Sequence, residues 1–574
     1  ISSLGNCFFI DNGSDSYGGI FNTDESLVQL MKRRGGVGIT LEHLRPATAT
    51  VNNAAQSSTG ATSFMDRFSN STREVAQDGR RGALMITMHI NHPDILDFIM
   101  KKDDLTKVTG ANVSVKVTDE FMNAVEKDED YLLRWPVESS QPRMLEKFTY
   151  NKLHRTEDGS YVRRVKAREI WNTIVKQAHK NAEPGVLFWD NVIKESPADM
   201  YSNLGFKTLG TNPCGEVPLS PYDSCRLGSI NVYTLVEEPF TKDARIDWAE
   251  LAKRAKFAQR FMDDIVEAEE EKIILILNKI DQDKEPEELK RTEREVWEKV
   301  LKVLRNGRRT GVGILGLGDM FAALGMRFGT PEATELAEKI HKVIAINSYR
   351  ESVNLAKERG CFPIWDADKE AINPFIRRVI SENFDNKEYE KYLQYGRRNI
   401  ANLSIAPTGS LAILAQTTSG IEPVFKIFYH RRRKVNPGEE GVKVSHVDEN
   451  GDSWEEYNVI HYPFIEWFSA QTDGKMTFNG AKVFLESQGE EELNNLVAQS
   501  PWAKSESHDI DYLEKVRMQG RIQKWIDHSI SVTHNLPEKI SIKEVNDIYF
   551  QGWKAGCKGL TIYREGSRSG VLIS

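Results

Sequence analysis

The sequence reads ALMITMH over residues 83–89 and ANVSVKV over residues 111–117, and both runs have the length and apolar character of short strands. A helix-like run, DEFMNAV at 119–125, follows the second strand, and helix-like patterns also cover residues 24–33 and 63–76. Strands and helices that alternate along a chain form parallel sheets, with the helices as connections. The sequence therefore predicts an α/β fold built on parallel strands.

Two stretches interrupt this alternation. Residues 267–300 carry a dense Glu/Lys/Arg pattern, which predicts solvated helices and no binding site. Residues 431–458 begin with four basic residues and pass through Pro-Gly and Asn-Gly pairs, which predicts an exposed hairpin or loop insertion. The basic residues 431–434 could bind phosphate, but we interpret them as part of a solvated surface. Because no Gly/Ser/Pro-rich linker separates these parts, we expect a single domain over residues 1–574 with two excursions.

The composition excludes several classes of protein. Hydrophobic residues make up 40% of the chain and charged residues 28%, as in globular proteins with ample core. The formal net charge of −8, with both signs interspersed, argues against a nucleic-acid partner. No apolar run approaches the roughly 20 residues that span a bilayer, and the first residues lack a signal peptide's regions. We expect a cytoplasmic protein without a membrane partner. Because the chain begins without Met, we expect a missing N-terminal extension, and the last residues also lack a cysteine pair, so we expect a missing C-terminal extension as well.

The five cysteines are too few and too scattered for a secreted disulfide framework. They form no CxxC pair and no Cys/His spacing of the zinc type, so we predict no metal ligands. In a cytosolic enzyme such cysteines are either inert buried thiols or chemical groups, and for any one of them burial is the more common case. They are Cys7, Cys214, Cys225, Cys361 and Cys557.

The motif GVGILG at 311–316 matches the GxGxxG pattern of dinucleotide-binding folds. That function requires an apolar strand before the glycines, whereas the preceding residues, 305–310, read RNGRRT. We therefore interpret the glycines as positions of tight helix packing and predict no nicotinamide site.

The chemically informative segment is TNPCGEVPL at 211–219. Its two prolines and its glycine disfavour a regular helix and favour a tight, exposed loop. Asn212, Cys214 and Glu216 alternate along it, so their side chains can point to one side, as along a strand. An amide, a thiol and a carboxylate that converge on one volume make a plausible active site. An ordinary turn with a buried cysteine remains the alternative when the segment is taken alone.

With other motifs in order along nearly the whole chain, this segment resembles the catalytic subunits of ribonucleotide reductases. The motifs are GNC at 5–7, GGVGI at 35–39, LRP at 44–46, GRRGA at 79–83, SCRL at 224–227, APTGS at 406–410, SVT at 531–533, NLP at 535–537 and GLTIYR at 559–564. The resemblance implies a ten-stranded α/β barrel of two five-stranded parallel halves, with residues 211–219 as a finger loop through its centre.

The resemblance also implies a division of chemical labour. Cys214 would hold a thiyl radical that abstracts the ribose C3′ hydrogen, Glu216 would act as general base on the 3′-hydroxyl, and Asn212 would orient the substrate. Cys7 and Cys225 match the pair that reduces the 2′ position and becomes a disulfide, which a thioredoxin-like or dithiol reductant then restores. Cys361 and Cys557 match no catalytic position, and we expect buried thiols there.

The resemblance implies two nucleotide sites. Substrate contacts fall on Asn6, Gly36, Pro407, Thr408, Gly409 and Ser410, the last four at the start of a predicted helix, where free N–H groups bind anions. A plain helix cap is the alternative for residues 407–410. Deoxynucleoside triphosphate or ATP effectors would bind at a homodimer interface through Asp15, Ser16, Arg45, Gln77, Arg80 and Arg81.

The sequence favours adenosylcobalamin as the radical source. Relatives that receive the radical from a partner subunit use adjacent tyrosines, but this chain has 17 tyrosines and no Tyr-Tyr pair, and the matching residues are Ile562 and Tyr563. The C-terminal residues do not resemble a glycyl-radical motif, and the NPCGE form of the loop resembles the cobalamin-dependent class. The alternatives are a metal-containing partner subunit, a catalytically silent nucleotide-binding relative, and another radical enzyme on the same barrel.

Overall fold

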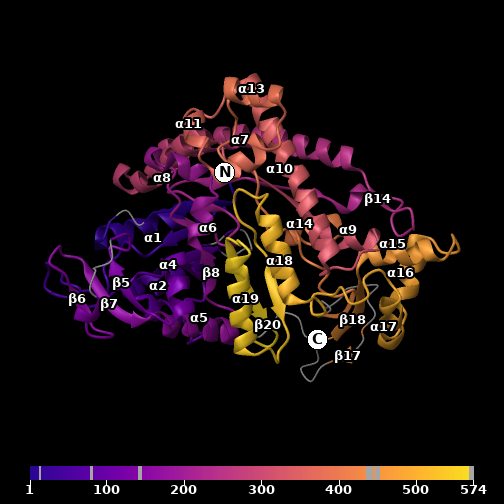
Figure 1. Cartoon of the computed structure of the whole chain (residues 1–574), viewed down its shortest axis with the longest axis horizontal. Coiled ribbons are helices and arrows are strands. Elements are labelled where there is room, and N and C mark those ends of the chain that lie inside the picture. The colour runs from indigo at the N-terminus through magenta and orange to yellow at the C-terminus, as the bar shows by residue number, and fades with distance from the viewer. Residues whose placement is uncertain are drawn as a thin grey trace.

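A computed structural model describes residues 1–11, 14–75, 77, 82–139, 145–434, 444, 446–447 and 453–567 (Figure 1). Its first half is a set of strands that pair in parallel in chain order, β1·β2·β3·β4·β8. These strands are β1 (Cys7–Ile10), β2 (Gly36–Thr40), β3 (Leu84–His89), β4 (Asn112–Val117) and β8 (Gly185–Phe188). The helices that alternate with them are α1 (Tyr17–Met31), α2 (Met65–Glu74), α3 (Ile95–Met100), α4 (Asp119–Lys127) and α5 (Ala167–Asn181). The predicted parallel α/β organisation is present.

Strands from distant parts of the sequence complete this sheet. At one edge β11 (Ser224–Cys225) pairs antiparallel with β1. At the other edge β20 (Gly559–Arg564) pairs antiparallel with β8, and β19 (Thr533–Leu536) pairs parallel with β20. The sheet is therefore mixed and eight-stranded in the described part of the chain. In Figure 1 the yellow C-terminal elements lie between the indigo first half and the orange second half.

The second half contains a smaller parallel pair, β12 (Leu227–Asn231) with β15 (Gly311–Leu315). Single parallel bridges extend it, from Val312 to Leu403 and from Ile405 to Ile530. The ten-stranded barrel is not confirmed, because no sheet closes on itself within the described residues. The later segments also contact the loop at 211–219: Ser529 N and Ser404 Oγ both donate to the Glu216 carbonyl.

The GxGxxG motif departs from its predicted role. Residues 311–315 are themselves the strand β15, so Gly311 and Gly313 lie within a strand, and Gly316, with a φ of +85°, precedes α9 (Leu317–Ala323). A Cβ on Gly313 would lie 2.2 Å from the carbonyl oxygen of Ser404. The glycines thus let two strand-like backbones approach each other, and the prediction of helix packing was wrong because their own strand was not recognised.

The charged segment 267–300 lies on two long helices, α7 (Trp248–Gln282) and α8 (Glu287–Gly307). These helices are not wholly solvated, because Glu269 is fully buried. Its carboxylate accepts hydrogen bonds from Leu4 N and Ser3 Oγ, so it fixes the N-terminal residues just before β1. The expectation of a purely solvated face was wrong at this position. The helix α10 (Pro331–Arg359) packs against α7.

The remaining elements form the periphery in Figure 1. Residues 428–460 contain an antiparallel pair, β16 (Phe428–Lys434) with β18 (Ser453–Ile460), as the predicted hairpin requires. Its neighbours are β17 (His446–Val447), α15 (Tyr462–Gln471), α16 (Phe478–Glu486) and α17 (Glu490–Ala498). A three-stranded sheet of β5 (Asp130–Trp135), β7 (Tyr161–Lys166) and β6 (Leu153–Arg155) flanks the first half, and α13 (Asn386–Tyr395) lies at the top of the view.

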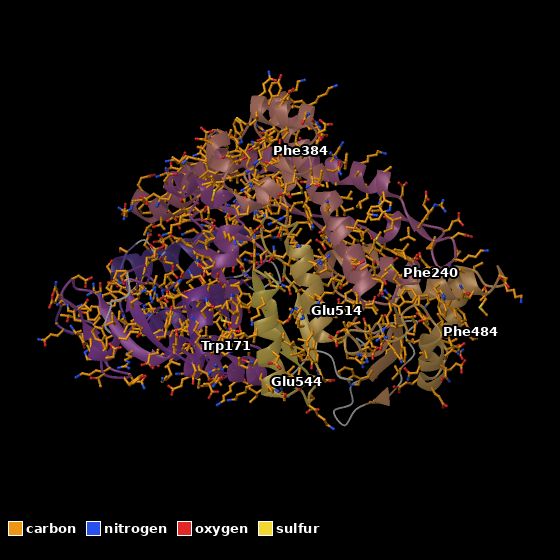
Figure 2. The ribbon with its side chains drawn as sticks, in the orientation of Figure 1. Trp171, Phe240, Phe384, Phe484, Glu514 and Glu544 are labelled. Carbon is orange, nitrogen blue, oxygen red and sulfur yellow. The ribbon has the colours of Figure 1, made fainter. Side chains whose placement is uncertain are left out.

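Two large clusters of buried apolar side chains form most of the core. One lies on the first sheet and includes Trp171, which meets the ring of Tyr549 edge-on at 5.8 Å and joins α5 to α19 (Ile542–Lys554) (Figure 2). The other surrounds β12 and β15 and includes Phe321 and Tyr349. The helix α18 (Tyr512–Gln523) contributes to both clusters. No helix of the described residues is long and apolar enough to cross a membrane.

Candidate active site

The finger loop, residues 209–219, is a narrow hairpin. Its arms are β9 (Gly210–Thr211) and β10 (Pro218–Leu219), which pair antiparallel. At the tip Asn212 N donates to the Val217 carbonyl at 3.2 Å, and Gly215 takes a φ of +82°, which only glycine adopts without strain. The result is an exposed Cys214 at the tip between two fully buried polar residues, Asn212 and Glu216.

The loop lies directly against the strands of the first half, and glycines make this possible. A Cβ on Gly38 of β2 would lie 1.9 Å from the carbonyl oxygen of Thr211. A Cβ on Gly210 would lie 2.2 Å from the ring of Phe9 on β1. Only hydrogen atoms fit in these gaps, so both positions must be glycine for the loop to keep its place.

Side chains of β4 hold the loop from one side. Asn112 Nδ2 donates to the Pro213 carbonyl at 3.1 Å, next to Cys214, and Lys116 Nζ donates to the Leu209 carbonyl at 2.7 Å, at the loop's base. Sequence reasoning missed both residues. The available signal was the alternation of Asn112, Ser114 and Lys116 in an otherwise apolar strand, which places polar side chains on one face. A lysine in a buried strand is rare unless it is paired.

Cys7 and Cys225 face each other across the edge of the sheet. They are direct partners in the β1·β11 ladder. Opposed residues of antiparallel strands have Cα atoms about 4.5–5.5 Å apart, within the range of roughly 4.4–6.8 Å that a disulfide requires. Both cysteines are free here. Asn212 Nδ2 lies 3.3 Å from Cys7 Sγ, which connects the pair to the finger loop.

The electrostatics of the site favour undissociated thiols. Desolvation, followed by the Glu216 carboxylate, raises the pKa of Cys214 to about 12, although its side chain remains reachable from outside. Burial also raises the pKa of Cys225 to about 12 and that of Cys7 well above its usual value. Burial raises the pKa of Glu216 to about 7, with Asn212 opposing the shift. The site therefore holds three S–H groups and one carboxyl that titrates near neutrality.

Glu216 has one oxygen free for a ligand. Its Oε2 atom is buried and accepts no hydrogen bond from the described residues. A buried carboxylate oxygen without a partner is costly, so such an atom points to a group that is bound during function. Cys361 and Cys557 take no part in this arrangement: Cys557 is buried with Sγ 3.8 Å from the Val516 carbonyl, and Cys361 is half-buried.

The predicted phosphate loop begins the short helix α14 (Gly409–Ala415). Pro407, Gly409 and Ser410 are exposed, but the Thr408 hydroxyl is buried and accepts a hydrogen bond from Gly420 N at 2.8 Å. The loop starts three residues after Ser404, which contacts the finger loop.

The other two predicted substrate residues, Asn6 and Gly36, lie near Pro213 of the finger loop. Gly36 N donates to the Asn6 carbonyl at 2.8 Å, and a Cβ on Gly36 would lie 3.1 Å from Pro213. Asn6 itself is exposed.

The predicted effector residues are brought together in part. Asp15, Ser16 and Arg45 line one pocket of about 270 Å³, together with Tyr17 and other residues. Within it Arg45 Nε lies 2.7 Å from Asp15 Oδ2. Gln77 does not line this pocket, and its amide donates to the Met31 carbonyl at 2.8 Å. Arg80 and Arg81 lie outside the described residues.

Two further cavities are lined by residues from the later part of the chain. A narrow one of about 30 Å³ is lined by Cys214 and Gly215, by residues 185–187 and 559–561 of β8 and β20, and by Ile530, Ser531 and Val532. A larger one of about 750 Å³ extends from α14 to the hairpin and α16, and Asn535 of β19 lines it. The two cavities thus adjoin neighbouring parts of one segment, residues 530–535.

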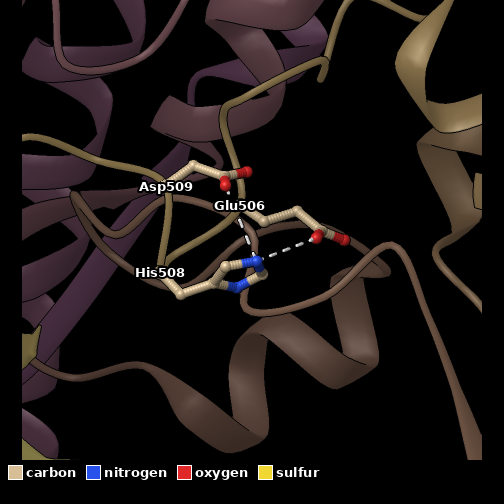
Figure 3. Close-up of side chains that lie close together, drawn as sticks. All are labelled: Glu506, His508 and Asp509. Atoms are coloured by element: carbon tan, nitrogen blue, oxygen red, sulfur yellow. Dashed lines mark ion pairs between the residues drawn. The ribbon is translucent and has the colours of Figure 1, made fainter. Parts of the chain in front are cut away.

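One other polar cluster lies near the larger cavity (Figure 3). His508 Nε2 is 3.7 Å from Glu506 Oε2 and 3.6 Å from Asp509 Oδ1. The spacing suits metal ligands, but Glu506 is already engaged by Ile427 N at 2.7 Å and the His508 side chain is more than half exposed. We interpret the cluster as a surface ion-pair group.

Comparisons with known proteins agree on one family. The family model described as "Ribonucleotide reductase, barrel domain" matches residues 5–563. The chain is 30% identical, over its full length, to proteins of Thermoplasma acidophilum and Mycobacterium tuberculosis that are named vitamin B12-dependent ribonucleoside-diphosphate reductase. It spans 63% and 69% of their respective lengths.

A solved structure extends the likeness to the fold. The Actinobacillus ureae class Id ribonucleotide reductase alpha subunit superposes with a TM-score of 0.65 at 17% identity, covering 98% of this chain and 84% of that one. Because the family model matches nearly all of the chain, the chain belongs to the ribonucleotide reductase barrel-domain family.

Proposed function

We propose that the protein reduces ribonucleotides, as diphosphates, to 2′-deoxyribonucleotides through a thiyl radical at Cys214. The observation that carries the proposal is the geometry at the finger loop. The tip presents Cys214 beside a buried carboxylate oxygen of Glu216 that has no partner among the described residues. Asn212 joins this loop to Cys7, which is the direct ladder partner of Cys225. The names of the full-length relatives support the same reaction.

The residues divide the chemistry as follows. The Cys214 thiol is undissociated at neutral pH, as hydrogen-atom transfer from sulfur requires. Glu216, with a pKa of about 7, accepts the proton of the 3′-hydroxyl. Cys7 and Cys225 together deliver two electrons and two protons, so that the 2′ C–O bond becomes C–H, water leaves and a disulfide forms. An external dithiol or thioredoxin-like protein then reduces that disulfide.

Adenosylcobalamin fits the chain as the radical source. When bound, it supplies a carbon radical by homolysis of its cobalt–carbon bond. The larger cavity has apolar walls that include Ile413, Phe425 and Phe478, and neutral amides that include Asn479 and Asn535, a mixture that suits an apolar macrocycle fringed by amides. The narrow cavity, which Val532 lines three residues before Asn535 in the same segment, reaches Cys214.

Position 562 supports the same assignment. Ile562 is buried in β20, where a chain dependent on a partner subunit would need an oxidisable phenol.

The nucleotide sites complete the proposal. The N-terminal end of α14, with Pro407, Thr408, Gly409 and Ser410, would bind the substrate phosphates, and Asn6 and Gly36 would also contact the substrate. The pocket of Asp15, Ser16 and Arg45 would bind a deoxynucleoside triphosphate or ATP as effector.

A homodimer is supported by an aromatic ridge on α1 beside this pocket. Tyr17 and Phe21 are stacked at 6.3 Å, and each is about half exposed, at 54% and 46%. The role of Gln77, Arg80 and Arg81 in effector binding remains a prediction from the sequence.

We also propose that the second half completes a barrel. The supporting observations are the parallel pair β12·β15, the parallel bridges at Leu403 and Ile405, and the parallel pair β19·β20. The cytoplasm is the proposed compartment, because Cys7 and Cys225 must be returned to thiols after each turnover and a reducing environment allows this.

One anaerobic assay tests the function. The protein is mixed with radiolabelled CDP, adenosylcobalamin and dithiothreitol, and deoxycytidine diphosphate is measured. We expect product with the native chain and with Cys361→Ser, and none with Cys214→Ser, because an oxygen radical at that position is too hard to form. If Cys214→Ser still formed product, Cys214 would not be the radical carrier. Activity that required a metal-containing partner, and ignored adenosylcobalamin, would change only the radical source.

A further inference from the structure

The base of the finger loop is held by a buried lysine to which no role has been assigned. Lys116 on β4 has no exposed surface. Its ammonium donates to the Leu209 carbonyl at 2.7 Å, lies 2.5 Å from Glu42 Oε2, and sits 4.6 Å from the centre of the Trp189 ring. Of these three contacts of the ammonium, the first holds the finger loop and the other two hold the lysine itself in place.

Stability alone does not require a charge here. Removing an ion pair from water costs several kcal/mol per ion, and apolar side chains of similar volume often stabilise such a position as well or better. Burial tends to raise the pKa of Glu42, but Lys116 and His89 outweigh it and hold that pKa below its usual value. Burial also lowers the pKa of Lys116, and its attraction to Glu42 offsets this only in part. What such a pair can provide is a specific position for the groups that it contacts. The ammonium donates hydrogen bonds in defined directions, which an apolar side chain cannot do.

Glu42 connects this lysine to the effector pocket. It lies two residues beyond the end of β2, and Leu44 and Arg45, two and three residues after it, line the pocket. The segment is short and well tied: Asp15 accepts from Arg45 N at 2.9 Å, and His92 Nε2 lies 2.8 Å from the Leu44 carbonyl. Glu42, the partner of Lys116, lies only three residues before Arg45. A ligand that binds Arg45 and shifts its backbone would therefore also shift Glu42.

We propose that Lys116 is a positioning residue for Cys214, and that the Glu42–Lys116 pair couples occupancy of the Asp15/Arg45 pocket to the placement of the finger loop. The coupling rests on the proposed function, in that the pocket binds a deoxynucleoside triphosphate. The positioning role rests on the contacts of Lys116 alone.

The chain offers a matched control at the other end of β4. Lys102 Nζ lies 2.5 Å from Glu183 Oε2 and donates to the Ala111 carbonyl at 2.7 Å, so it too combines a largely buried glutamate with a backbone carbonyl. These contacts lie at the start of β4 and do not reach the finger loop. Lys116→Met and Lys102→Met therefore remove comparable interactions, and only the first removes an anchor of Cys214.

The first measurement is the alkylation rate of Cys214, read by mass spectrometry at mildly alkaline pH, with and without dATP. In the native chain and in Lys102→Met we expect dATP to change the rate by about fivefold or more, the range of ordinary allosteric coupling. In Lys116→Met we expect faster alkylation without ligand and a dATP effect below about twofold. Equal behaviour of the two lysine variants would overturn the proposal.

A second variant covers the case in which Lys116→Met does not fold. Glu42→Gln keeps the shape of the side chain and removes only its charge, and we expect it to reproduce the loss of the dATP effect. In the double variant the two losses should not add, because both act on one pair. Additive losses, or a full dATP effect in Glu42→Gln, would refute the coupling.

Turnover provides a readout that separates positioning from binding. We expect Lys116→Met to lower kcat by about a hundredfold with little change in KM, since a displaced thiol still leaves the phosphate site intact. Alkylation needs no turnover, so an inactive native chain would refute the proposed function while the alkylation rates still decide the role of Lys116. Failure of dATP to bind in equilibrium dialysis would refute the coupling, and the ligand-free rates would still decide the positioning.

Discussion

Glu216 combines a carboxyl group that titrates near neutrality with a wholly buried position. Because its pKa is raised in the folded chain to about 7 from 4.5, the folded state binds the proton more tightly than the unfolded state. The free energy of unfolding should therefore fall between pH 4.5 and 7 as the pH rises, by about 3 kcal/mol from this group. Denaturation of Glu216→Gln across this range should lack that part of the slope, and identical slopes would contradict the assigned pKa.

The same carboxyl predicts the pH dependence of turnover. As a general base Glu216 must be ionised, so kcat should rise with pH through about 7. Glu216→Gln should lose most of the activity, and what remains should not follow this titration. If the native chain is active but its kcat does not change between pH 6 and 8, Glu216 is not the general base.

The roles of Cys7 and Cys225 can be tested by a single turnover without external reductant. Enzyme that is first reduced, then freed of dithiol and mixed with substrate, should form about one product per active site and stop. Peptide mapping should then recover the two residues as a disulfide, since the ladder already places them opposite each other. Cys361 serves as the internal control and should remain a thiol. Free Cys7 and Cys225 after the burst would refute the pairing.

At the residue scale, motifs predicted the chemical groups but not their supports. Asn212, Cys214 and Glu216 could be found because prolines and glycine mark the loop and because the residues alternate. Lys116 could not, since its partners Glu42 and Leu209 are far away in sequence and only the fold brings them together. The contact of Asn112 with the Pro213 carbonyl was hidden for the same reason.

At the scale of elements, the crossing of β2 by the finger loop yields a sharp prediction. Gly38→Ala would place a methyl group 1.9 Å from the Thr211 carbonyl oxygen, so either the loop or the strand must move. We expect destabilisation of roughly 1–3 kcal/mol and a loss of turnover of about a hundredfold. Gly489→Ala, where a Cβ meets nothing within 4 Å, is the control for turnover and should leave turnover unchanged. Unaltered turnover in Gly38→Ala would contradict the observed crossing.

The elements themselves show which patterns a sequence reveals. The strands at 83–89 and 111–117 and the helix at 119–125 were predicted to within one or two residues, because each is a continuous apolar or amphipathic run. β15 was missed, since its glycines suppress the strand signal and are required by the approach of Ser404. The charged helices were predicted as helices, but the burial of Glu269 depends on a contact with the N-terminus that no local pattern contains.

At the scale of the whole molecule, the arrangement of the halves explains why the chemistry needs the entire chain. The finger loop begins on the first half, is fixed by β4, and is held at Glu216 by Ser404 and Ser529 of the second half. Neither half alone can place Cys214. No sequence pattern predicts the cavities that result, because they form between segments more than 100 residues apart, such as residues 409–429 and 535.

The cavity of about 750 Å³ leads to the last prediction, which concerns adenosylcobalamin. Ile413 and Leu414 are neighbours on α14 and both are 81% exposed, but only Ile413 lines the cavity. A carboxylate at either position costs little stability, because both side chains already face water. If the apolar wall receives the cofactor, Ile413→Glu should bury its charge against the corrin and weaken binding by at least about tenfold, whereas Leu414→Glu should not.

Binding is measured by ultrafiltration, with the cofactor followed by its visible absorbance, so the result does not depend on turnover. In the native chain, adenosylcobalamin without any partner protein should then also support reduction of CDP. Equal binding by the two glutamate variants would place the cofactor elsewhere, even if it were still required. Absence of binding to the native chain would transfer the radical source to a partner subunit. The thiols at the finger loop would keep their roles in either case, because their geometry is set by β1, β4 and β11 and not by the cavity wall.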